Sequence, residues 1–448
     1  MNKRWDFKAI PDDESIKQLS EAINVNPSLA TILIQRNIKT FDEAKSFFRP
    51  SLAELHDPFL MEDMVVAVSR IEKAIQRREK ILIYGDYDVD GTTAVSLVYS
   101  FLKNVYPAIE YYIPDRYKEG YGISYKGIDY ASKNHFSLII SLDCGIKSTE
   151  HIKYAKERSI DFIICDHHTP GQELPEAVAV LDPKRKDCNY PYKELSGCGV
   201  GFKLMEAFAR KNNIPSSELL PFLDLVAISI CSDIVPITGE NRILTYYGLQ
   251  QINKNPRPGV KALIGVSGLK KELDVTNVVF GLGPRINAAG RIAHANAAVQ
   301  LLTCENTEEA EQWAKNIDDK NLTRKDFDSS ITEEAIQMIE QDELLLQARS
   351  TVLFKKDWHK GVIGIVASRC IEKYYRPTVI LTESNNYATG SARSVDGFDL
   401  YEAISRCSDL LEQFGGHMYA AGLTLKKENI PAFAEKFESV VRELITED

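Results

Sequence analysis

Three aspartates alternate with other residues directly after an apolar run in the segment ILIYGDYDVDG, residues 81–91. In an extended chain, side chains two positions apart point to the same side, so Asp86, Asp88 and Asp90 would converge on one small volume. Carboxylates this close repel one another and are costly to ionise together unless cations neutralise them. The segment is therefore typical of a cation site, although an acidic surface turn has the same composition.

The same arrangement recurs three times further along the chain. Asp143 follows the apolar run SLIISL, and Asp166, His167 and His168 follow DFIIC, while Asp233 ends LVAISICS, which indicates a buried helix rather than a strand. Helical patterns lie between these runs, and repeated strand–helix–strand units predict a parallel α/β sheet. Loops at the carboxyl ends of such strands meet in one crevice, so we expect all these side chains to form one site.

The residue types in this cluster favour a particular class of metal. His167 stands directly after an acid at a predicted strand end, which favours ligation over an ordinary structural role. Carboxylates and imidazole without thiolates suit Mn²⁺ or Mg²⁺ better than a structural zinc ion. The eight cysteines are scattered without CxxC spacing, and several lie in apolar runs. They indicate reduced, mostly buried thiols, with neither a disulfide framework nor a zinc knuckle.

Length and charge restrict the function classes. With 448 residues and 44% hydrophobic content, the chain is long enough for more than one domain. No apolar run approaches the roughly 20 residues that span a bilayer, and the first residues lack the apolar core of a secretion signal, which predicts a cytoplasmic location. The net charge of −10 disfavours a protein that coats DNA. A nucleic-acid enzyme with a local basic groove remains compatible with it.

Shifts in composition divide the chain into four parts. Residues 1–50 predict an N-terminal helical lead-in, and 51–304 predict an α/β body with a parallel sheet. Residues 305–347 are highly charged, contain no Gly or Pro and have apolar residues at helical spacing, which predicts one or two helices linking two domains. An ordinary surface helix would look the same. A second, smaller α/β pattern over 348–448 favours the linker.

Three local predictions follow from the same patterns. SELLPFLDLVAISI, residues 217–230, predicts a helix, and LYEAISRCSDLLEQF, residues 400–414, predicts another. The stretch GGHMYAAG, residues 415–422, predicts a loop.

Basic residues stand beside small residues in several predicted loops. Arg116 lies in IPDRYKEGYG, Arg285 and Arg291 in GPRINAAGR, and Arg393 in GSARS. Small residues let backbone N–H groups approach an anion while a guanidinium binds it bidentately, so phosphate contact is one interpretation. Any single arginine here is also compatible with a surface ion pair. His417 in FGGHMYAAG has a neighbourhood that permits substrate contact or a structural role.

Several motifs together resemble a known group of enzymes. GDYDVDG, LDCGI, CDHH and CSDIVP, in that order, resemble the four motifs of the DHH phosphoesterase superfamily, and FGGHMYAAG resembles its DHHA1 domain. GPRINAAGR, WHKGVIGIVASR and GSARSVDGFDL are more selective, and they resemble the RecJ family of bacterial single-strand-specific exonucleases. The resemblance covers nearly the whole chain from about residue 50.

The resemblance implies an activity and a cofactor. RecJ membership implies a 5′ to 3′ exonuclease that degrades single-stranded DNA to 5′-mononucleotides in recombination and DNA repair, with two Mn²⁺ or Mg²⁺ ions that activate a water for in-line attack on phosphorus. It implies a cleft between the DHH and DHHA1 domains as the location of this site.

The resemblance also implies residue roles. By the family's motif positions, the expected metal ligands are Asp86, Asp88, Asp90, Asp143, His167 and Asp233, with Asp166 and His168 in or beside that shell. Arg116, Ser391 and Arg393 match positions associated with the 5′-terminal phosphate, and Arg285, Asn287 and His417 match contacts around the scissile phosphate.

Partners are implied in the same way. Single-stranded DNA is the expected substrate, and a helicase and a single-strand-binding protein are compatible partners of a protein expected to be a monomer. Family members usually continue into an oligonucleotide-binding β-barrel, whereas this sequence stops at VVRELITED without that run of short strands. Either a shortened chain or a naturally short member is compatible with this. Without the barrel we expect weaker single-strand affinity and processivity rather than altered chemistry.

Two other functions stay open. A DHH-family phosphodiesterase of short oligonucleotides or cyclic dinucleotides would use the same ligands, although the long chain and GPRINAAGR favour RecJ. A catalytically silent replication scaffold would share the fold, but it has no need for so many clustered acids.

Overall fold

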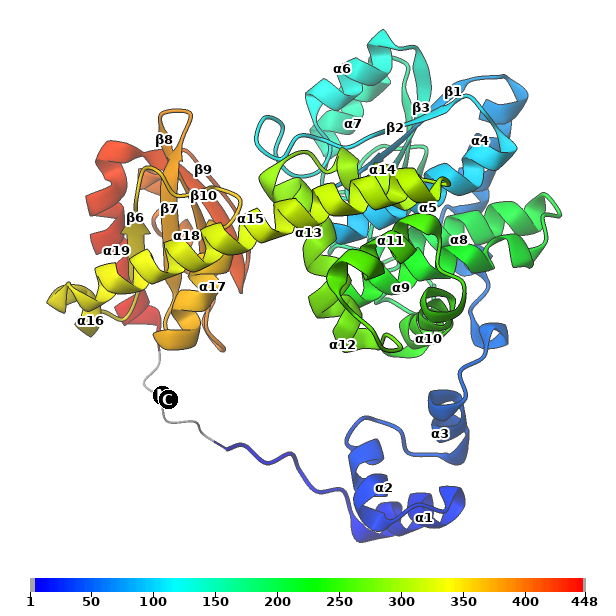
Figure 1. Cartoon of the computed structure of the whole chain (residues 1–448), viewed down its shortest axis with the longest axis horizontal. Coiled ribbons are helices and arrows are strands. Elements are labelled where there is room, and N and C mark those ends of the chain that lie inside the picture. Colours follow the sequence, from blue (N-terminus) through cyan, green and yellow to red (C-terminus); the bar gives the residue numbers. More distant parts are fainter. Residues whose placement is uncertain (1–4, 446–448) are drawn as a thin grey trace. The chain divides into compact units, whose positions relative to one another are not determined.

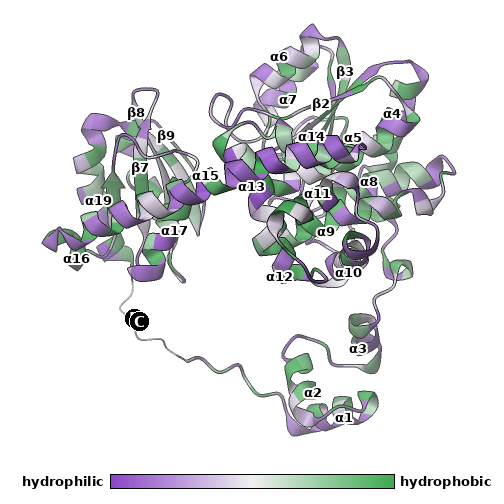
Figure 2. Ribbon diagram, in the orientation of Figure 1, coloured by the Kyte–Doolittle hydropathy of each residue, from purple (hydrophilic) through white to green (hydrophobic). Residues whose placement is uncertain are grey.

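The computed structural model describes residues 5–445, and these form two compact units, one up to residue 319 and a smaller one from residue 320 (Figure 1). Each unit has its own five-stranded sheet, which confirms the predicted α/β class. Helix α15, Thr307–Glu340, runs from the first unit into the second. Figure 2 shows hydrophilic residues along most of it, as its charged sequence predicts. No helix among the described residues is both long and apolar enough to cross a membrane.

Three short helices form the predicted lead-in, and each begins at a side-chain cap. Asp12, Asn26 and Thr40 accept hydrogen bonds from the first turns of the helices that they precede, which satisfies otherwise unpaired N–H groups. A small apolar core joins the helices. They are α1 (Asp13–Ile23), α2 (Pro27–Ile34) and α3 (Phe41–Phe48).

The sheet of the first unit is entirely parallel, with strand order β2-β1-β3-β4-β5. Its central strands are buried on both faces, as their continuous Ile- and Leu-rich sequences predict. The strands are β1 (Lys80–Gly85), β2 (Ile109–Tyr112), β3 (Phe136–Leu142), β4 (Asp161–Cys165) and β5 (Ala179–Leu181).

Helices cover both faces of this sheet. Ile81 and Ile83 of β1 share a core with α4, α5 and α8, whereas Leu82 and Tyr84 share another with α6 and α7. The period of two along β1 therefore sends alternate side chains into two cores. The helices are α4 (Met64–Gln76), α5 (Val89–Val105), α6 (Tyr125–Lys133), α7 (Thr149–Lys156) and α8 (Gly197–Lys211).

A group of helices completes the first unit. The prediction of one helix over 217–230 is wrong at its start, because 3₁₀ turns at Ser216–Glu218 and Leu220–Phe222 precede α9. Pro221 explains the break, since it lacks the N–H group that a continuous helix would use. The helices are α9 (Leu223–Ser232), α10 (Gly239–Lys254), α11 (Pro258–Ser267), α12 (Val275–Asn277), a π-helix (Val278–Leu282), α13 (Gly283–Ile292) and α14 (Asn296–Thr303).

The second sheet is mixed, with strand order β6-β7-β8-β10-β9 and a parallel pairing only between β6 and β7. Two local predictions are wrong here, because the helix at 400 ends at Ser405 and most of 415–422 forms a hairpin. The elements are α16 (Glu343–Gln347), β6 (Thr351–Phe354), α17 (Ile363–Lys373), β7 (Thr378–Ser384), β8 (Tyr387–Arg393), α18 (Leu400–Ser405), β9 (Gln413–His417), β10 (Ala420–Lys426) and α19 (Ile430–Leu444).

The hairpin has a specific cause. Gly416 has a φ of 153°, and a Cβ there would lie 2.3 Å from the Ala420 carbonyl oxygen. Only glycine allows this approach, which lets Phe414 pair with Leu423 across the two strands. Pairing with β10 thus decides the conformation of 413–417, against the local helical pattern.

The cysteines match their prediction. All eight are free thiols, and seven are buried while Cys304 is partly exposed.

Candidate metal centre

The predicted acids meet at the carboxyl edge of the first sheet. Strands β1, β3 and β4 are neighbours, and Asp86, Asp143 and Asp166 each follow the last residue of one of them. Asp233 comes from a helix rather than from a strand, because it is the C-cap of α9. His167 lies among them, as the parallel topology predicts.

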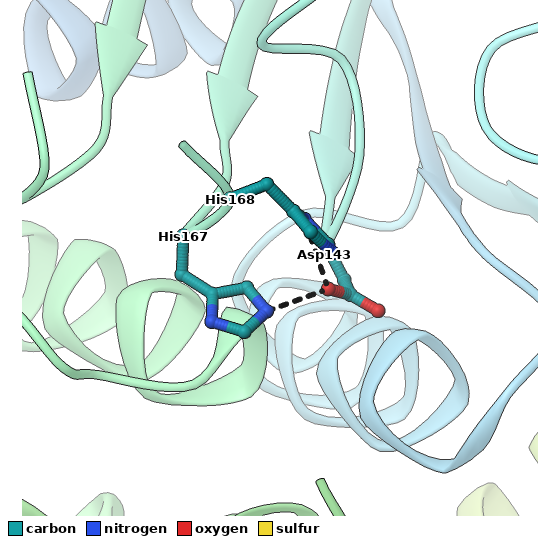
Figure 3. A group of neighbouring side chains, drawn as sticks. All are labelled: Asp143, His167 and His168. Atoms are coloured by element: carbon teal, nitrogen blue, oxygen red, sulfur yellow. Dashed lines mark ion pairs between the residues drawn. The ribbon is translucent and has the colours of Figure 1, made fainter. Parts of the chain in front are cut away.

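His167 is the hub of the cluster. Its Nε2 lies 3.2 Å from Oδ1 of Asp143, 3.5 Å from Oδ2 of Asp90 and 3.6 Å from Oδ2 of Asp233. Figure 3 shows the imidazoles of His167 and His168 both directed at the same oxygen of the Asp143 carboxylate. Two groups of donors lie within ligating reach of one another: Asp143 with His167 and His168, and Asp90 with His167 and Asp233.

The first acidic loop is not the extended chain that we predict from its alternation. Helix α5 begins at Val89, so Asp88 is its N-cap and Asp90 lies in its first turn. Asp88 accepts a hydrogen bond from the Gly91 N–H at 3.0 Å. The three carboxylates approach the site through a strand–turn–helix, because β1 ends at Gly85, before the first aspartate, and capping by Asp88 starts α5 before the third.

Asp90 is held by the start of α8. Its Oδ2 accepts from the Gly197 N–H at 2.6 Å, and its Oδ1 accepts from the Cys198 N–H at 2.8 Å and from the Ser229 hydroxyl at 2.7 Å. Helix N-termini stabilise anions in this way. There is no room for a side chain at Gly197, because a Cβ there would lie 2.6 Å from the Cβ of Asp143.

Burial makes the carboxylates difficult to ionise without a cation. It raises the pKa of Asp86 well above its ordinary value, and the Asp88 carboxylate raises it further. Burial and then Asp90 raise the pKa of Asp143 in the same way. Burial and then Asp233 raise the pKa of Asp90 to about 6. Without a cation these carboxyl groups therefore tend to keep protons, because the surrounding protein groups do not fully compensate the charge that they would carry together.

Four buried atoms at the centre have no hydrogen-bond partner among the described residues. They are Oδ2 of Asp86, Oδ1 of Asp143, Nδ1 of His167 and Oδ2 of Asp233. Buried polar atoms normally have a partner, and a concentration of exceptions needs an explanation. Oxygen and imidazole donors of this kind fit a hard divalent cation, so the residues present suit Mn²⁺ or Mg²⁺.

Asp166 and His168 form a separate pair beside these donors. Oδ1 of Asp166 accepts from Nδ1 of His168 at 2.7 Å, and its oxygens also accept from the N–H groups of His167 and Ile146. Burial alone would raise the pKa of Asp166, but the bond and charge of His168 lower it to about 2. Partial burial would lower the pKa of His168, but Asp166 raises it to about 9. Asp166 therefore orients the two histidines.

Sequence reasoning missed two residues of the centre. The Tyr121 hydroxyl lies 3.3 Å from Nε2 of His168 and 3.3 Å from the carbonyl oxygen of Asp143, and more than half of the side chain is exposed. Asp182 is fully buried at the end of β5, and its Oδ2 has no partner among residues 5–445. Its position after the strand VAVL repeats the signal that marks Asp143 and Asp166, whereas no comparable pattern marks Tyr121.

Two of the predicted substrate residues lie at this centre. The guanidinium of Arg116 lies 4.7 Å from the centre of the Tyr87 ring, and its charge acts on Asp86. Asn287 accepts a hydrogen bond from the Val89 N–H at 3.2 Å, so it fixes the start of α5. Helix α13 packs closely here, because a Cβ at Gly290 would lie 2.6 Å from the Tyr87 carbonyl oxygen.

Arg285 has a different position from its neighbour on α13. Its Nε donates to Asp318 at 2.8 Å and its Nη1 to the Gly281 carbonyl at 2.7 Å, and the side chain is largely buried. These contacts tie α13 to α15 and give Arg285 a structural task.

The remaining three predicted residues belong to the second unit. Ser391 and Arg393 lie on β8, and Nη1 of Arg393 donates to the Ser391 hydroxyl at 3.0 Å. A Cβ at Gly364, in the first turn of α17, would lie 2.8 Å from each of their side chains. His417 ends β9, and its Nδ1 accepts from the Tyr419 N–H at 3.2 Å. The structure thus joins Ser391 and Arg393 at the N-terminus of α17, and holds His417 in the β9–β10 turn.

Comparison with known proteins agrees with both units. Residues 80–230 match the DHH family, N-terminal domain, and residues 347–443 match the DHHA1 domain. The single-stranded-DNA-specific exonuclease RecJ of Escherichia coli is 36% identical over 399 residues, which cover 84% of this chain and 69% of that protein. The chain belongs to the RecJ family.

Other RecJ proteins show the extent of the match. The Bacillus subtilis RecJ is 42% identical over 99% of this chain, but the chain spans only 56% of that protein's length. The crystal structure of RecJ in complex with Mn²⁺ from Thermus thermophilus superposes with a TM-score of 0.86 at 27% identity, covering 99% of this chain and 63% of that one. A RecJ structure in complex with Mg²⁺ from the same organism gives a TM-score of 0.79.

Proposed function

We propose that this chain is a metal-dependent 5′ to 3′ exonuclease that hydrolyses single-stranded DNA to 5′-mononucleotides. The observation that carries the proposal is the set of buried aspartate and histidine atoms without a hydrogen-bond partner in the described chain, at the carboxyl edge of the parallel sheet. The relatives named as single-stranded-DNA-specific exonucleases support this substrate, and the relatives solved with Mn²⁺ or Mg²⁺ support the cofactor.

The centre offers ligands for two divalent ions. When bound, two such ions supply activation of water and stabilisation of the charge that develops at phosphorus and at the leaving oxygen. The residues that would hold them are Asp86, Asp88, Asp90, Asp143, His167 and Asp233.

The pair of Asp166 and His168 has a separate task in this proposal. In the metal-free protein Asp166 raises the pKa of His168 to about 9, and it holds the ring with Nδ1 bound to Asp166 and Nε2 near the Tyr121 hydroxyl. A proton at Nε2 would face a phosphate held at the centre, where a fixed positive charge stabilises the developing negative charge. Asp166 prevents the ring from turning away.

We propose that the 5′-terminal phosphate is bound by Arg116, Ser391 and Arg393. A guanidinium, a hydroxyl and the nearby N-terminus of α17 provide donors and a favourable dipole for an anion. Asn287 and His417 stay as proposed contacts near the scissile phosphate. For Arg285 the contacts with Asp318 and Gly281 support an indirect role through the position of α13.

One assay tests the proposal against its alternatives. The purified chain is given a 5′-phosphorylated single strand labelled at its 3′ end, the corresponding duplex, a linear dinucleotide and a cyclic dinucleotide, each with Mn²⁺, Mg²⁺ or chelator. We expect mononucleotides from the single strand with either metal and none with chelator. If only the dinucleotides were cleaved, the proposed function would be wrong and the chain would be a phosphodiesterase of dinucleotides. No hydrolysis under any condition, with calorimetry showing bound metal, would favour a scaffold.

Further details belong to the same proposal. We propose domain limits at 1–50, 51–304, 305–347 and 348–448. We also propose a cytoplasmic location, action as a monomer in recombination and repair, and delivery of the strand by a helicase and a single-strand-binding protein. The charged composition of α15 supports a linker role.

A further inference from the structure

A lysine-lined pocket lies in the first unit, outside the metal centre. It has a volume of about 560 Å³ and is formed by the end of α10, by α11 and by the loop that leads to α12. These helices lie together on one side of the unit (Figure 1). Its charged lining residues are Lys254, Lys261, Lys270, Lys271 and Glu272. With four lysines and one glutamate, the pocket is locally positive, although the net charge of the whole chain is −10.

The lysines of this pocket are available to a ligand. All four are exposed, and none of their ammonium groups pairs with a carboxylate of the described chain. Elsewhere on the first unit, lysines such as Lys153, Lys156 and Lys211 form ion pairs with glutamates. Four unpaired like charges around one concavity repel one another, so an anion with several charges would relieve the repulsion.

Direct contacts connect the pocket to the metal centre. Asp233 is a proposed ligand, and a Cβ at Gly283 would lie 2.6 Å from the hydroxyl of the preceding Ser232. A Cβ at Gly281 would lie 2.8 Å from Leu269, which lines the pocket. Gly281 belongs to the π-helix Val278–Leu282 and Gly283 begins α13 directly after it, so the π-helix and the start of α13 together connect the end of α9 with the lysine loop. π-helical segments are rare and often occur at functional sites.

Two apolar side chains lie exposed along this connection. Phe280, inside the π-helix, is 76% exposed, and Ile234, directly after Asp233, is fully exposed. Phe280 directly precedes Gly281, whose Cβ position lies beside the pocket residue Leu269, and an exposed aromatic ring together with basic residues is a combination that binds single-stranded nucleic acid by stacking and charge.

We infer that a single strand held at the metal centre runs over Phe280 and places its sugar–phosphate backbone in the lysine pocket. The inference rests on the proposed function and adds a second contact region to it. It predicts that the pocket acts only on strands long enough to reach from the metal centre past Phe280. A dinucleotide would be hydrolysed without it.

The test compares two double variants with the same change in charge. Lys270→Glu with Lys271→Glu alters the pocket, and Lys73→Glu with Lys133→Glu alters two exposed lysines on α4 and α6. We expect the pocket variant to raise KM for a long single strand about tenfold or more, with kcat and dinucleotide hydrolysis unchanged. The control variant should match the wild type on both substrates. Equal effects of the two variants would overturn the inference, because only overall charge would then matter.

Binding without hydrolysis gives a second readout. In chelator, neutralising Lys270→Gln and Lys271→Gln should reduce the slope of log affinity against log salt by about 1.4, since each phosphate contact on a single strand contributes about 0.7. Phe280→Ala should weaken affinity about tenfold without changing that slope, because stacking is not ionic. Phe41→Ala, which also removes an exposed ring, is its control.

The outcomes separate the inference from the proposed function. A wild-type chain that hydrolyses single strands while the pocket variants bind them normally would overturn the inference alone. A chain that never hydrolyses single strands would overturn the proposed function, and slope changes in chelator would still show whether the pocket binds a strand. Loss of duplex binding with normal single-strand binding would contradict the inference.

Discussion

The edges of the two sheets present opposite charges. At the first sheet, parallel strands bring aspartates and a histidine together, and four buried atoms there have no hydrogen-bond partner in the described chain. At the second sheet, an antiparallel strand presents Ser391 and Arg393 to the start of α17, and Arg393 already bonds to its neighbours. The difference supports the proposals that a cation completes the first site and that the second binds an anion. Four predictions test this contrast, from the largest expected effect to the smallest.

Asp143→Asn should separate activity from stability. We expect kcat to fall about 10³-fold or more, because a central ligand is lost. The metal-free protein should melt at a higher temperature than the wild type, because the substitution removes a buried carboxylate whose pKa is raised. Steady-state kinetics and thermal melts in chelator measure both. Asp326→Asn, an exposed change on α15, is the control. Normal activity in Asp143→Asn would refute the two-ion centre.

Gly197→Ala should damage the centre without touching a ligand. The new methyl group would lie 2.6 Å from Cβ of Asp143, so either that ligand or the start of α8 must move. Displacement of about 1 Å in a reacting site lowers rates by roughly 10²-fold, and we expect a loss of that size in dinucleotide or single-strand hydrolysis. Gly265→Ala is the matched control, because a Cβ there meets nothing within 4 Å. Equal activities would show that the close approach is unimportant.

Arg393→Ala should affect binding rather than chemistry. We expect KM for a 5′-phosphorylated strand to rise about tenfold with kcat nearly unchanged, and little effect on a 5′-hydroxyl strand, because charged hydrogen bonds to the terminal phosphate are lost. Arg406→Ala removes a surface arginine of the same unit as a control. If Arg393→Ala lowered kcat as much as Asp143→Asn does, the proposal that the second sheet edge acts in binding and the first in chemistry would be wrong.

Asp182→Asn should change how stability depends on pH. Burial raises the pKa of Asp182 to about 7, with Lys184 opposing and Asp166 adding to the shift. The folded state therefore keeps a proton that the unfolded state releases, so the contribution of Asp182 to stability is lost as pH rises from about 4 through 7. The asparagine variant should match the wild type near pH 4 and exceed it by about 4 kcal/mol at pH 8, since each unit of pKa shift is worth about 1.4 kcal/mol. Urea unfolding in chelator measures this, and a pH-independent difference would contradict it.

The sequence could predict which acidic and histidine residues follow strands and that these residues lie close together. Asp143, Asp166 and His167 follow apolar strands, and parallel topology brings strand ends together, so their proximity follows from local pattern. The shape of the first loop could not be predicted, because the side chain of Asp88 caps α5 by accepting a hydrogen bond from the Gly91 N–H. Tyr121 was missed because its link to His168 depends on how a loop folds over β3.

Long-range contacts decided the other differences. The donors of Arg285 are used by Asp318, which is distant in sequence and belongs to α15. The β9–β10 hairpin replaced a predicted loop because Gly416 allows a close approach that no propensity reveals. Patterns predict elements, and packing between elements decides which polar groups remain available to a ligand.

The ligand-bearing segments lie as far apart in the chain as Asp86 and Asp233. A bound cation would therefore hold four separate stretches of polypeptide together, and it would do so only in the folded protein. We expect metal-starved molecules to open more often at this edge and to be cut there by proteases. Scarcity of divalent ions would then lower the amount of the protein in a cell as well as its rate of turnover on DNA.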